Sequence, residues 1–284
     1  MHHITRRLSP SIIVAIVALA AAWACAGTAS AAVPGLHLVT TGSDLNSVDK
    51  GRVAVCPSGE SAVGGGGQII FGNGQVLLDD MVPKTGAFSA FGREDQDGFQ
   101  FGWGVAASAI CASPIPGLQV VPGPSPVNSD DKSARATCPP DKQVIGAGAE
   151  LNGGSGQVTL DDVIPKTTTV DVRAREDRDG LATNWSVTAY AVCANPLPGL
   201  QIVQKTSATD SFASKSIAAN CPPGKKLLGG GGEITFGSGG TEVVLTEVRP
   251  NGSTLTSMIA GASEIQGGST RNWNITAYAV CAFP

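Results

Sequence analysis

Histidine is almost absent from this sequence of 284 residues. Of its three histidines, His2 and His3 lie in the N-terminal segment, which leaves only His37 in the remainder. A zinc site needs several His or Cys ligands, and Ser-His-Asp or Cys-His catalysis needs a histidine base. Because His37 stands alone, the sequence argues against both kinds of chemistry.

Charge is also sparse, and it is not clustered. Charged residues make up 15% of the chain, with 19 basic and 23 acidic residues. Removing Arg6 and Arg7 with the N-terminal segment takes 2 from 19 and leaves 17 basic residues, so the formal net charge becomes −6. A mildly acidic chain without Lys/Arg runs is a poor ligand for nucleic acids and for anionic membrane surfaces. We therefore expect no nucleic-acid partner.

A long hydrophobic run is missing too. The apolar stretch Ile12–Ala22 is shorter than the roughly 20 apolar residues that a membrane-spanning helix needs. It follows two arginines and precedes Ala29-Ser30-Ala31, the small-x-small pattern of a secretory cleavage site. We therefore expect residues 1–31 to be a cleaved signal peptide, the mature protein to be secreted to the extracellular space, and no membrane span.

No stretch shows sustained helical periodicity. The segment from Asn184 to Cys193 instead alternates with period two, which is typical of a strand with one buried face. The 37 glycines and 18 prolines interrupt the chain at short intervals. The sequence therefore predicts an all-β protein.

One pattern occurs three times along the chain. Each copy has Cys-Pro, then a run of small residues, and finally a Trp eight positions before a second Cys, as in Trp103 to Cys111. A Pro-Gly-Leu phrase opens each copy, at Pro34, Pro116 and Pro198. Self-similarity at a fixed period identifies a repeated structural unit. We expect β repeats at residues 32–115, 116–197 and 198–284.

Six cysteines remain if Cys25 leaves with the signal peptide, and an even number in an exported protein indicates a disulfide framework. The Cys-to-Cys spacings within the copies are 55, 55 and 60. These spacings predict one bond in each copy, namely Cys56–Cys111, Cys138–Cys193 and Cys221–Cys281. The alternative for Cys25 is acylation, as in a lipoprotein.

Two arrangements of the copies fit the sequence. They could be three tandem disulfide-stapled antiparallel β-sandwich-like repeats of about 82 residues, or one pseudo-threefold β-prism. Only a few residues separate each second Cys from the next copy, so we expect neighbouring copies to touch in either arrangement.

The repeated motifs resemble those of a small secreted β module of bacteria, actinobacteria especially. The resemblance depends on Cys-Pro, the glycine strand and the closing Trp-x-Val-Thr-Ala-Tyr-Ala-Val-Cys, best seen at 185–193, and it covers nearly the whole mature chain. It implies export and a binding or structural role. It brings no catalytic residues with it.

The glycine runs Gly64–Gly67 and Gly229–Gly232 do not form a phosphate-binding loop, because no Lys-Ser/Thr and helix follow them. The second copy places Ala147 and Ala149 within the same run, so small size is what matters. We expect Gly64, Gly146, Gly229 and the residues two positions later to face something large, and the natural candidates are Trp103, Trp185 and Trp273.

Acidic residues cluster in the first two copies. Hard carboxylate ligands at this density could bind Ca²⁺, but no EF-hand loop is present. We favour solvated acidic turns that pair with Arg93, Arg173 and Arg175, and therefore expect no cofactor and no metal. The alternative calcium ligands are Asp79, Asp80, Asp95, Asp97, Asp161, Asp162, Asp177 and Asp179.

Paired carboxylates could also hydrolyse glycosides. That chemistry needs two carboxyl groups about 5 to 10 Å apart across a cleft, and Asp80 with Glu94 is the pair to consider. The third copy keeps only Glu247 and Glu264, which suits a scaffold better than a catalytic centre.

Aromatic side chains favour binding. Five of the eight phenylalanines lie in the first copy, and period-two spacing would place Phe99, Phe101 and Trp103 on one face of a strand, where exposed rings could stack on a ligand. The sequence as a whole predicts a secreted, non-enzymatic binding or structural protein, whose partner is an extracellular glycan or protein. The alternative is a secreted carbohydrate-active enzyme that uses paired carboxylates.

Overall fold

The computed structural model describes residues 1–3, 33–236, 243–265, 268–269 and 271–284, which form eighteen β-strands and no helix. The all-β prediction is confirmed. No helix long and apolar enough to cross a membrane occurs in this part of the chain. The expected signal peptide, with its cleavage site and Cys25, falls almost entirely in residues 4–32, outside the described residues.

Each copy of the repeat contributes six strands. The first copy forms β1 (His37–Gly42), β2 (Lys50–Val55), β3 (Ser61–Ile70), β4 (Val76–Lys84), β5 (Ala87–Glu94) and β6 (Gly104–Ala112). The second forms β7 (Gln119–Pro124), β8 (Lys132–Thr137), β9 (Gln143–Asn152), β10 (Val158–Pro165), β11 (Thr169–Glu176) and β12 (Ser186–Ala194). The third forms β13 (Gln201–Thr206), β14 (Ser214–Asn220), β15 (Lys226–Phe236), β16 (Val243–Pro250), β17 (Ser257–Glu264) and β18 (Trp273–Ala282).

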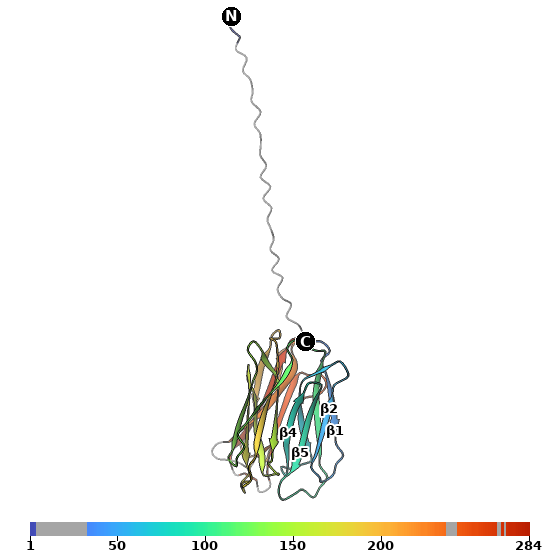
Figure 1. Ribbon diagram of the computed structural model, residues 1–284, viewed down its shortest axis with the longest axis vertical. Helices are drawn as coiled ribbons and strands as arrows, with labels where there is room; N and C mark the ends of the chain where they lie inside the picture. Colours follow the sequence, from blue (N-terminus) through green and yellow to red (C-terminus); the bar gives the residue numbers. More distant parts are fainter. Residues whose placement is uncertain (4–32, 237–242, 266–267, 270) are drawn as a thin grey trace.

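The strands form three six-stranded antiparallel sheets, and each sheet combines three strands from each of two copies (Figure 1). The sheet orders are β1-β6-β3-β16-β17-β14, β13-β18-β15-β10-β11-β8 and β2-β5-β4-β9-β12-β7. Equivalent strands pair at all three junctions between copies: β3 with β16, β9 with β4, and β15 with β10. This cyclic exchange is the pseudo-threefold prism arrangement. Separate tandem sandwiches are ruled out, because every sheet crosses between copies.

We call each junction between copies a seam. At each seam only two residue pairs are in register, for example Glu247 with Gln68 and Val248 with Gly67 in the seam between the third and first copies. The ladder between the two copies does not continue beyond these pairs. The seams are therefore the places where side chains of different copies can surround a cleft.

The three disulfides form within the copies, as predicted: Cys56–Cys111, Cys138–Cys193 and Cys221–Cys281. The first Cys of each pair follows a strand of one sheet and the second lies in a strand of another sheet. Each bond therefore links two sheets, and the three bonds together link all three.

The glycine runs lie where β3, β9 and β15 approach one another at the centre of the prism. A Cβ built on Gly64 would lie 2.1 Å from the carbonyl oxygen of Leu228, and one on Gly146 would lie 2.7 Å from that of Val63. The expectation that these glycines face the tryptophans is wrong: they face backbone of the neighbouring copy. Gly92, by contrast, does pack against a tryptophan, because its Cβ would lie 2.7 Å from the Trp103 ring.

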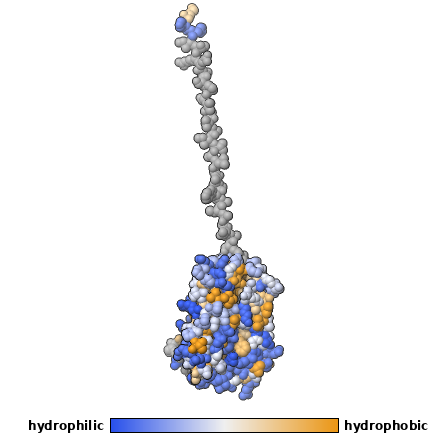
Figure 2. Space-filling model, in the orientation of Figure 1, coloured by the Kyte–Doolittle hydropathy of each residue, from blue (hydrophilic) through white to orange (hydrophobic). Residues whose placement is uncertain are grey.

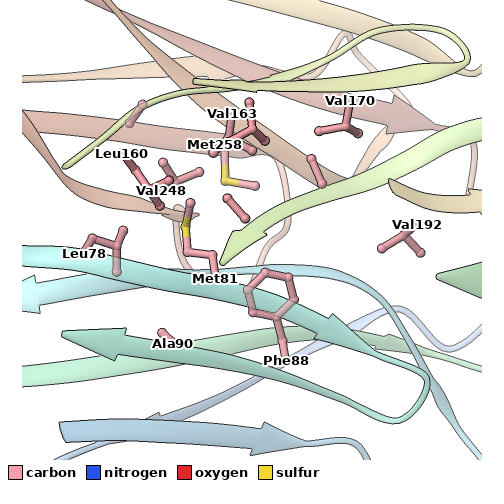
Figure 3. Packing of buried hydrophobic residues seen from close by; sticks show 14 of the residues in the cluster. Leu78, Met81, Phe88, Ala90, Leu160, Val163, Val170, Val192, Val248 and Met258 are labelled. Carbon is pink, nitrogen blue, oxygen red and sulfur yellow. The ribbon is translucent and has the colours of Figure 1, made fainter. Parts of the chain in front are cut away.

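A single core fills the space between the sheets. Leu78 and Phe88 of the first copy, Leu160 of the second and Val248 and Met258 of the third lie in the same buried cluster (Figure 3). Continuous burial of apolar area is the main stabilising contribution in such a core.

The two ends of the prism differ. The C-terminus lies at the top of the folded body in Figure 1. The disulfides lie at the same end, since Cys281 comes three residues before the C-terminal Pro284 and Cys111 pairs with the first residue of β1. The loops after β1, β3 and β5, and their equivalents in the other copies, lie at the opposite end. We call this opposite end the distal end.

Candidate functional site

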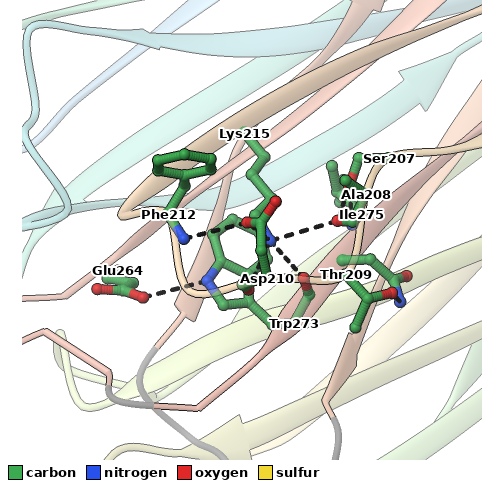
Figure 4. A network of polar contacts seen from close by, with 10 residues as sticks. Ser207, Ala208, Thr209, Asp210, Phe212, Lys215, Glu264, Trp273 and Ile275 are labelled. Carbon is green, nitrogen blue, oxygen red and sulfur yellow. Dashed lines mark hydrogen bonds and ion pairs between the residues drawn. The ribbon is translucent and has the colours of Figure 1, made fainter.

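Trp103, Trp185 and Trp273 are each buried in a polar unit that repeats in all three copies. Trp273 donates its indole N–H to Glu264 at 3.1 Å, and the ammonium of Lys215 lies 4.2 Å from the ring centroid (Figure 4). Lys215 also pairs with Asp210 at 2.8 Å. A cation over an indole face is an attractive contact, and burial strengthens it.

The same unit occurs in the first two copies. Trp103 donates to Glu94 at 2.6 Å beneath Lys50, and Trp185 donates to Glu176 at 2.8 Å beneath Lys132. The second oxygen of Glu94 accepts the backbone N–H of Phe99, which fixes the loop after β5. This unit was not predicted from the sequence, although a Glu precedes Trp103, Trp185 and Trp273 by nine positions in each case.

The expected row of ligand-binding aromatics does not exist. Phe99 is 6% exposed and Trp103 is fully buried, whereas Phe101 is 70% exposed. The period-two argument is wrong here because residues 99–102 form a loop and β6 begins only at Gly104. Phe101 remains a candidate contact residue, and its ring packs edge-on against Phe99.

Four of the proposed calcium ligands converge at the distal end. Asp95, Asp97, Asp177 and Asp179 line one cavity of about 150 Å³, although they come from two copies. Burial, and then the neighbouring Asp97, raise the pKa of Asp95 to about 6. Asp177 accepts two backbone N–H groups of its own loop, at 3.0 and 3.1 Å, and Gln96 donates to Asp179 at 2.9 Å.

The convergence does not by itself make a metal site. Within the described residues, one group of three potential metal ligands has its ligand atoms close together, and it consists of His37, Glu60 and Cys111. The sulfur of Cys111 is committed to a disulfide. Nothing in the distal cluster groups three carboxylates in that way.

Asp79 and Asp161 are buried, contrary to the expectation of solvated turns. Each is the extra residue of a β-bulge, in β4 and β10 respectively. Arg93 lies 3.6 Å from Asp79, and Arg175 forms an ion pair with Asp161, so two of the expected arginine partners are in place. Burial is the main cause that raises the pKa of Asp79 to about 6 and that of Asp161 to about 7.

Asp80 and Asp162 belong to the seams. Asp80 lies directly opposite Glu150 of the next copy, and Asp162 lies opposite Glu233. Burial raises the pKa of Asp80 to about 7, with Asp79 as the second cause, and that of Asp162 to about 6, with Glu233 as the second cause. Arg173, the third expected partner, lies 3.8 Å from Asp162.

Tyrosines complete these two seam sites. Tyr190 donates its hydroxyl to Glu150, and Tyr278 donates to Glu233. Burial and the adjacent carboxylate raise the pKa of each tyrosine. The seam sites open into clefts of about 280 Å³ beside Asp80 and about 500 Å³ beside Asp162. Sequence reasoning missed Glu150, Glu233 and both tyrosines, because only the strand exchange between copies brings them to Asp80 and Asp162.

The carboxylate pair considered for glycoside hydrolysis does not converge. Val76 pairs with Glu94, and Asp80 lies four residues further along β4, which corresponds to about 13 Å at the usual rise of a strand. Glu94 is in addition held by Trp103 and by the Phe99 N–H. Asp80 with Glu94 is therefore not a catalytic pair.

A scan against protein-family models and a search of the curated proteins both find no match to this chain. The function is therefore inferred from the geometry of the fold and its clefts.

Proposed function

We propose that this chain is a secreted, non-catalytic binding protein that holds an extracellular glycan with the loops of its distal end. One observation carries the proposal. Most of the large apolar side chains that are exposed in the described body of the prism lie in distal loops, and these are Leu45, Val48, Phe71, Phe101, Val127 and Phe212.

Such side chains cost solvation free energy when they are exposed without a partner. They do not form one continuous hydrophobic surface; apolar groups lie in separate patches among hydrophilic ones on the face seen in Figure 2. Isolated apolar contacts within a polar surface suit a hydrated polymer better than a large protein interface, which has an apolar core of its own.

Export is supported by two observations. Three disulfides link the sheets, and such bonds persist in oxidising compartments outside the cytosol. The pattern of residues 1–31 is that of a secretory signal. The sequence resemblance to secreted actinobacterial modules agrees with this assignment.

A second candidate function is glycoside hydrolysis at the seams. It is favoured by the opposed carboxyl groups of Asp162 and Glu233, which lie beside Tyr278 in an open cleft. A carboxyl group whose pKa is raised to about 6 can act as a general acid near neutral pH. Two of the three seams contain such a set.

One experiment separates the two functions. The secreted protein is incubated with insoluble plant, fungal and bacterial polysaccharides, and both retention on the polymer and released reducing sugar are measured. We expect retention without product, and we expect replacement of Leu45, Phe71, Phe101 and Phe212 by Ser to abolish it. Replacement of Val53, Val55 and Phe283, which are exposed away from the distal end, is the matched control. Release of sugar that Asp162→Asn or Asp80→Asn abolishes would contradict the proposal.

A further inference from the structure

The seam between the third and first copies differs from the other two at its β-bulge. In the first two copies the bulge residue is an aspartate paired with an arginine, Asp79 with Arg93 and Asp161 with Arg175. In the third copy the bulge lies between Leu245 and Glu247, which places Thr246 at the equivalent position.

The arginine position changes together with the aspartate position. In the ladder of β4 with β5, Arg93 is opposite Leu77, and in that of β10 with β11, Arg175 is opposite Thr159. Leu77 and Thr159 each lie two residues before the bulge residue. At the same register in the third copy, Ser263 is opposite Val244. Two short hydroxyl side chains thus replace a long ion pair. The space that remains is a cleft of about 430 Å³, which Thr246 and Ser263 line.

Phe71 of the first copy stands at the edge of this cleft. Its equivalent in the third copy is Phe236, which pairs with Trp273; Phe71 has the same register, one residue beyond the Ile70–Gly104 pair. The ring centroid of Phe236 lies 5.4 Å from the guanidinium of Arg175. Phe71 therefore occupies the same position as Phe236, but at its seam Ser263 stands where the second copy has Arg175. Phe71 is 66% exposed.

Phe71 also has an unfavourable backbone conformation. Its φ is +63°, in the left-handed region, where the Cβ of an L-residue crowds the following carbonyl. The second copy has Gly153 at this position, with a φ of +90°, so the turn itself is better served by glycine. An exposed phenylalanine gains little from packing. Strain of this kind that burial does not offset is typical of functional positions.

The loop that carries Phe71 is held firmly on the third copy. A Cβ on Gly74 would lie 2.0 Å from the carbonyl oxygen of Glu264, so the two backbones are in direct contact. The ring is thereby presented at a defined place beside β17, which is the preorganisation that a binding site needs.

We infer that this cleft is a saccharide-binding site, in which Phe71 stacks on a sugar ring and neutral hydrogen-bonding groups hold its hydroxyls. Those groups are the side chains of Asn73, Ser214, Thr246 and Ser263, which line the cleft together with Phe71. A volume of about 430 Å³ lies within the range of small-molecule sites, and the mixture of an aromatic wall with convergent hydroxyl and amide groups fits a polyhydroxylated ligand. Ser214 and Ser263 are 3.3 Å apart and can serve neighbouring hydroxyls of one sugar.

The inference rests on the proposed function, because it assigns the glycan to one part of the distal end. Two variants test the cleft itself. Phe71→Gly copies the second copy at that position, and the double variant Thr246→Asp with Ser263→Arg restores the ion pair of the other copies and fills the cleft. Phe283→Ser removes an exposed phenylalanine at the opposite end of the prism, outside the proposed binding surface, and is the matched control.

The secreted protein is titrated calorimetrically with short oligosaccharides of glucose, N-acetylglucosamine, mannose, galactose and xylose. We expect at least one class to bind, both cleft variants to weaken that affinity by about tenfold or more, and Phe283→Ser to leave it unchanged. Phe71→Gly should keep the full melting temperature, so its loss of binding cannot come from unfolding, and it decides the test alone if the double variant does not fold.

Two results would overturn the inference. One is that no oligosaccharide binds to the unchanged protein. The other is that binding survives in Phe71→Gly. If binding survives there but is lost when all four distal apolar residues are replaced, the glycan lies elsewhere at the distal end, and the proposed function stands without this site.

Discussion

At the residue scale, the carboxylates of this protein differ in the group that lies nearest to them. Glu94, Glu176 and Glu264 accept an indole N–H and are thereby part of the scaffold. Asp80 and Asp162 instead face another carboxyl group across a seam. Residue type alone could not separate these two groups, because the separation depends on which strands become neighbours.

The buried tryptophan is the residue on which each copy depends most. Trp185→Ala removes a large side chain from the core and leaves Glu176 without its indole donor and Lys132 without the ring. We expect the free energy of unfolding to fall by about 3 to 5 kcal/mol, as for other large core truncations. Denaturant unfolding followed by circular dichroism measures this loss. A change close to zero would mean that the Trp unit does not stabilise the fold.

Asp80 should make the protein less stable as the pH rises. Its pKa is about 7 in the folded protein and about 3.8 in the unfolded chain, so the folded state holds the proton more tightly. The stabilisation is therefore complete below about pH 4 and is lost as the pH rises through about 7. Asp80→Asn keeps the oxygen that accepts the Leu151 N–H and removes the titration.

Asp80→Asn changes the free energy of unfolding at pH 8 and at pH 4. We expect the change at pH 8 to be more stabilising than the change at pH 4 by on the order of 1 to 2 kcal/mol. Thermal melts at several pH values measure this difference. Asp44→Asn, at an exposed loop position, is the control. An equal effect of Asp80→Asn at both pH values would show that this carboxyl group is not perturbed.

At the scale of the strand, the glycine runs are explained by what lies opposite them. The strands β3 and β16 approach so closely that a Cβ on Gly66 would lie 1.9 Å from the carbonyl oxygen of Val248. The second copy tolerates Ala147 and Ala149 because they occupy the other face of β9, toward the core of the prism. In that copy, Gly146 and Gly148 thus mark the face of β9 that meets the neighbouring copy, and Ala147 and Ala149 mark the other face.

Gly66→Ala should therefore loosen the seam between β3 and β16. We expect a loss of roughly 1 to 3 kcal/mol in the free energy of unfolding, as for overpacked positions. Gly42→Ala adds the same methyl group at a place where nothing lies within 4 Å, and it should be close to neutral. Denaturant midpoints of the two variants give the comparison. Equal midpoints would contradict the close approach of the strands.

At the scale of the whole molecule, strand exchange makes the three copies interdependent. A chain that ends at residue 197 would lack β15, β16 and their neighbours, and would leave β3 and β10 as unpaired edges. We expect this truncated chain to be unfolded by circular dichroism, and the full chain to unfold in one cooperative transition in calorimetry. A folded two-copy chain would show that the copies are independent modules.

The sequence was sufficient for the strands and the disulfides but not for the sites. Alternation and repetition report local structure, so the all-β class and the bonds such as Cys138–Cys193 followed from them. The approach of Glu150 to Asp80, or of Phe71 to Ser263, depends on exchange between copies, which no local pattern encodes. The expectation for Phe99 and Trp103 was wrong because a loop replaced an assumed strand.

The most direct test of distal-end binding without catalysis is hydrogen–deuterium exchange, measured by mass spectrometry, on the protein with and without a polysaccharide that retains it. The account predicts slower exchange in the distal loops, foremost in residues 71–74 and at the end of β17, with the polymer left intact. Protection confined to the disulfide end, or to the seam strands around Asp162 with cleavage of the polymer, would contradict it.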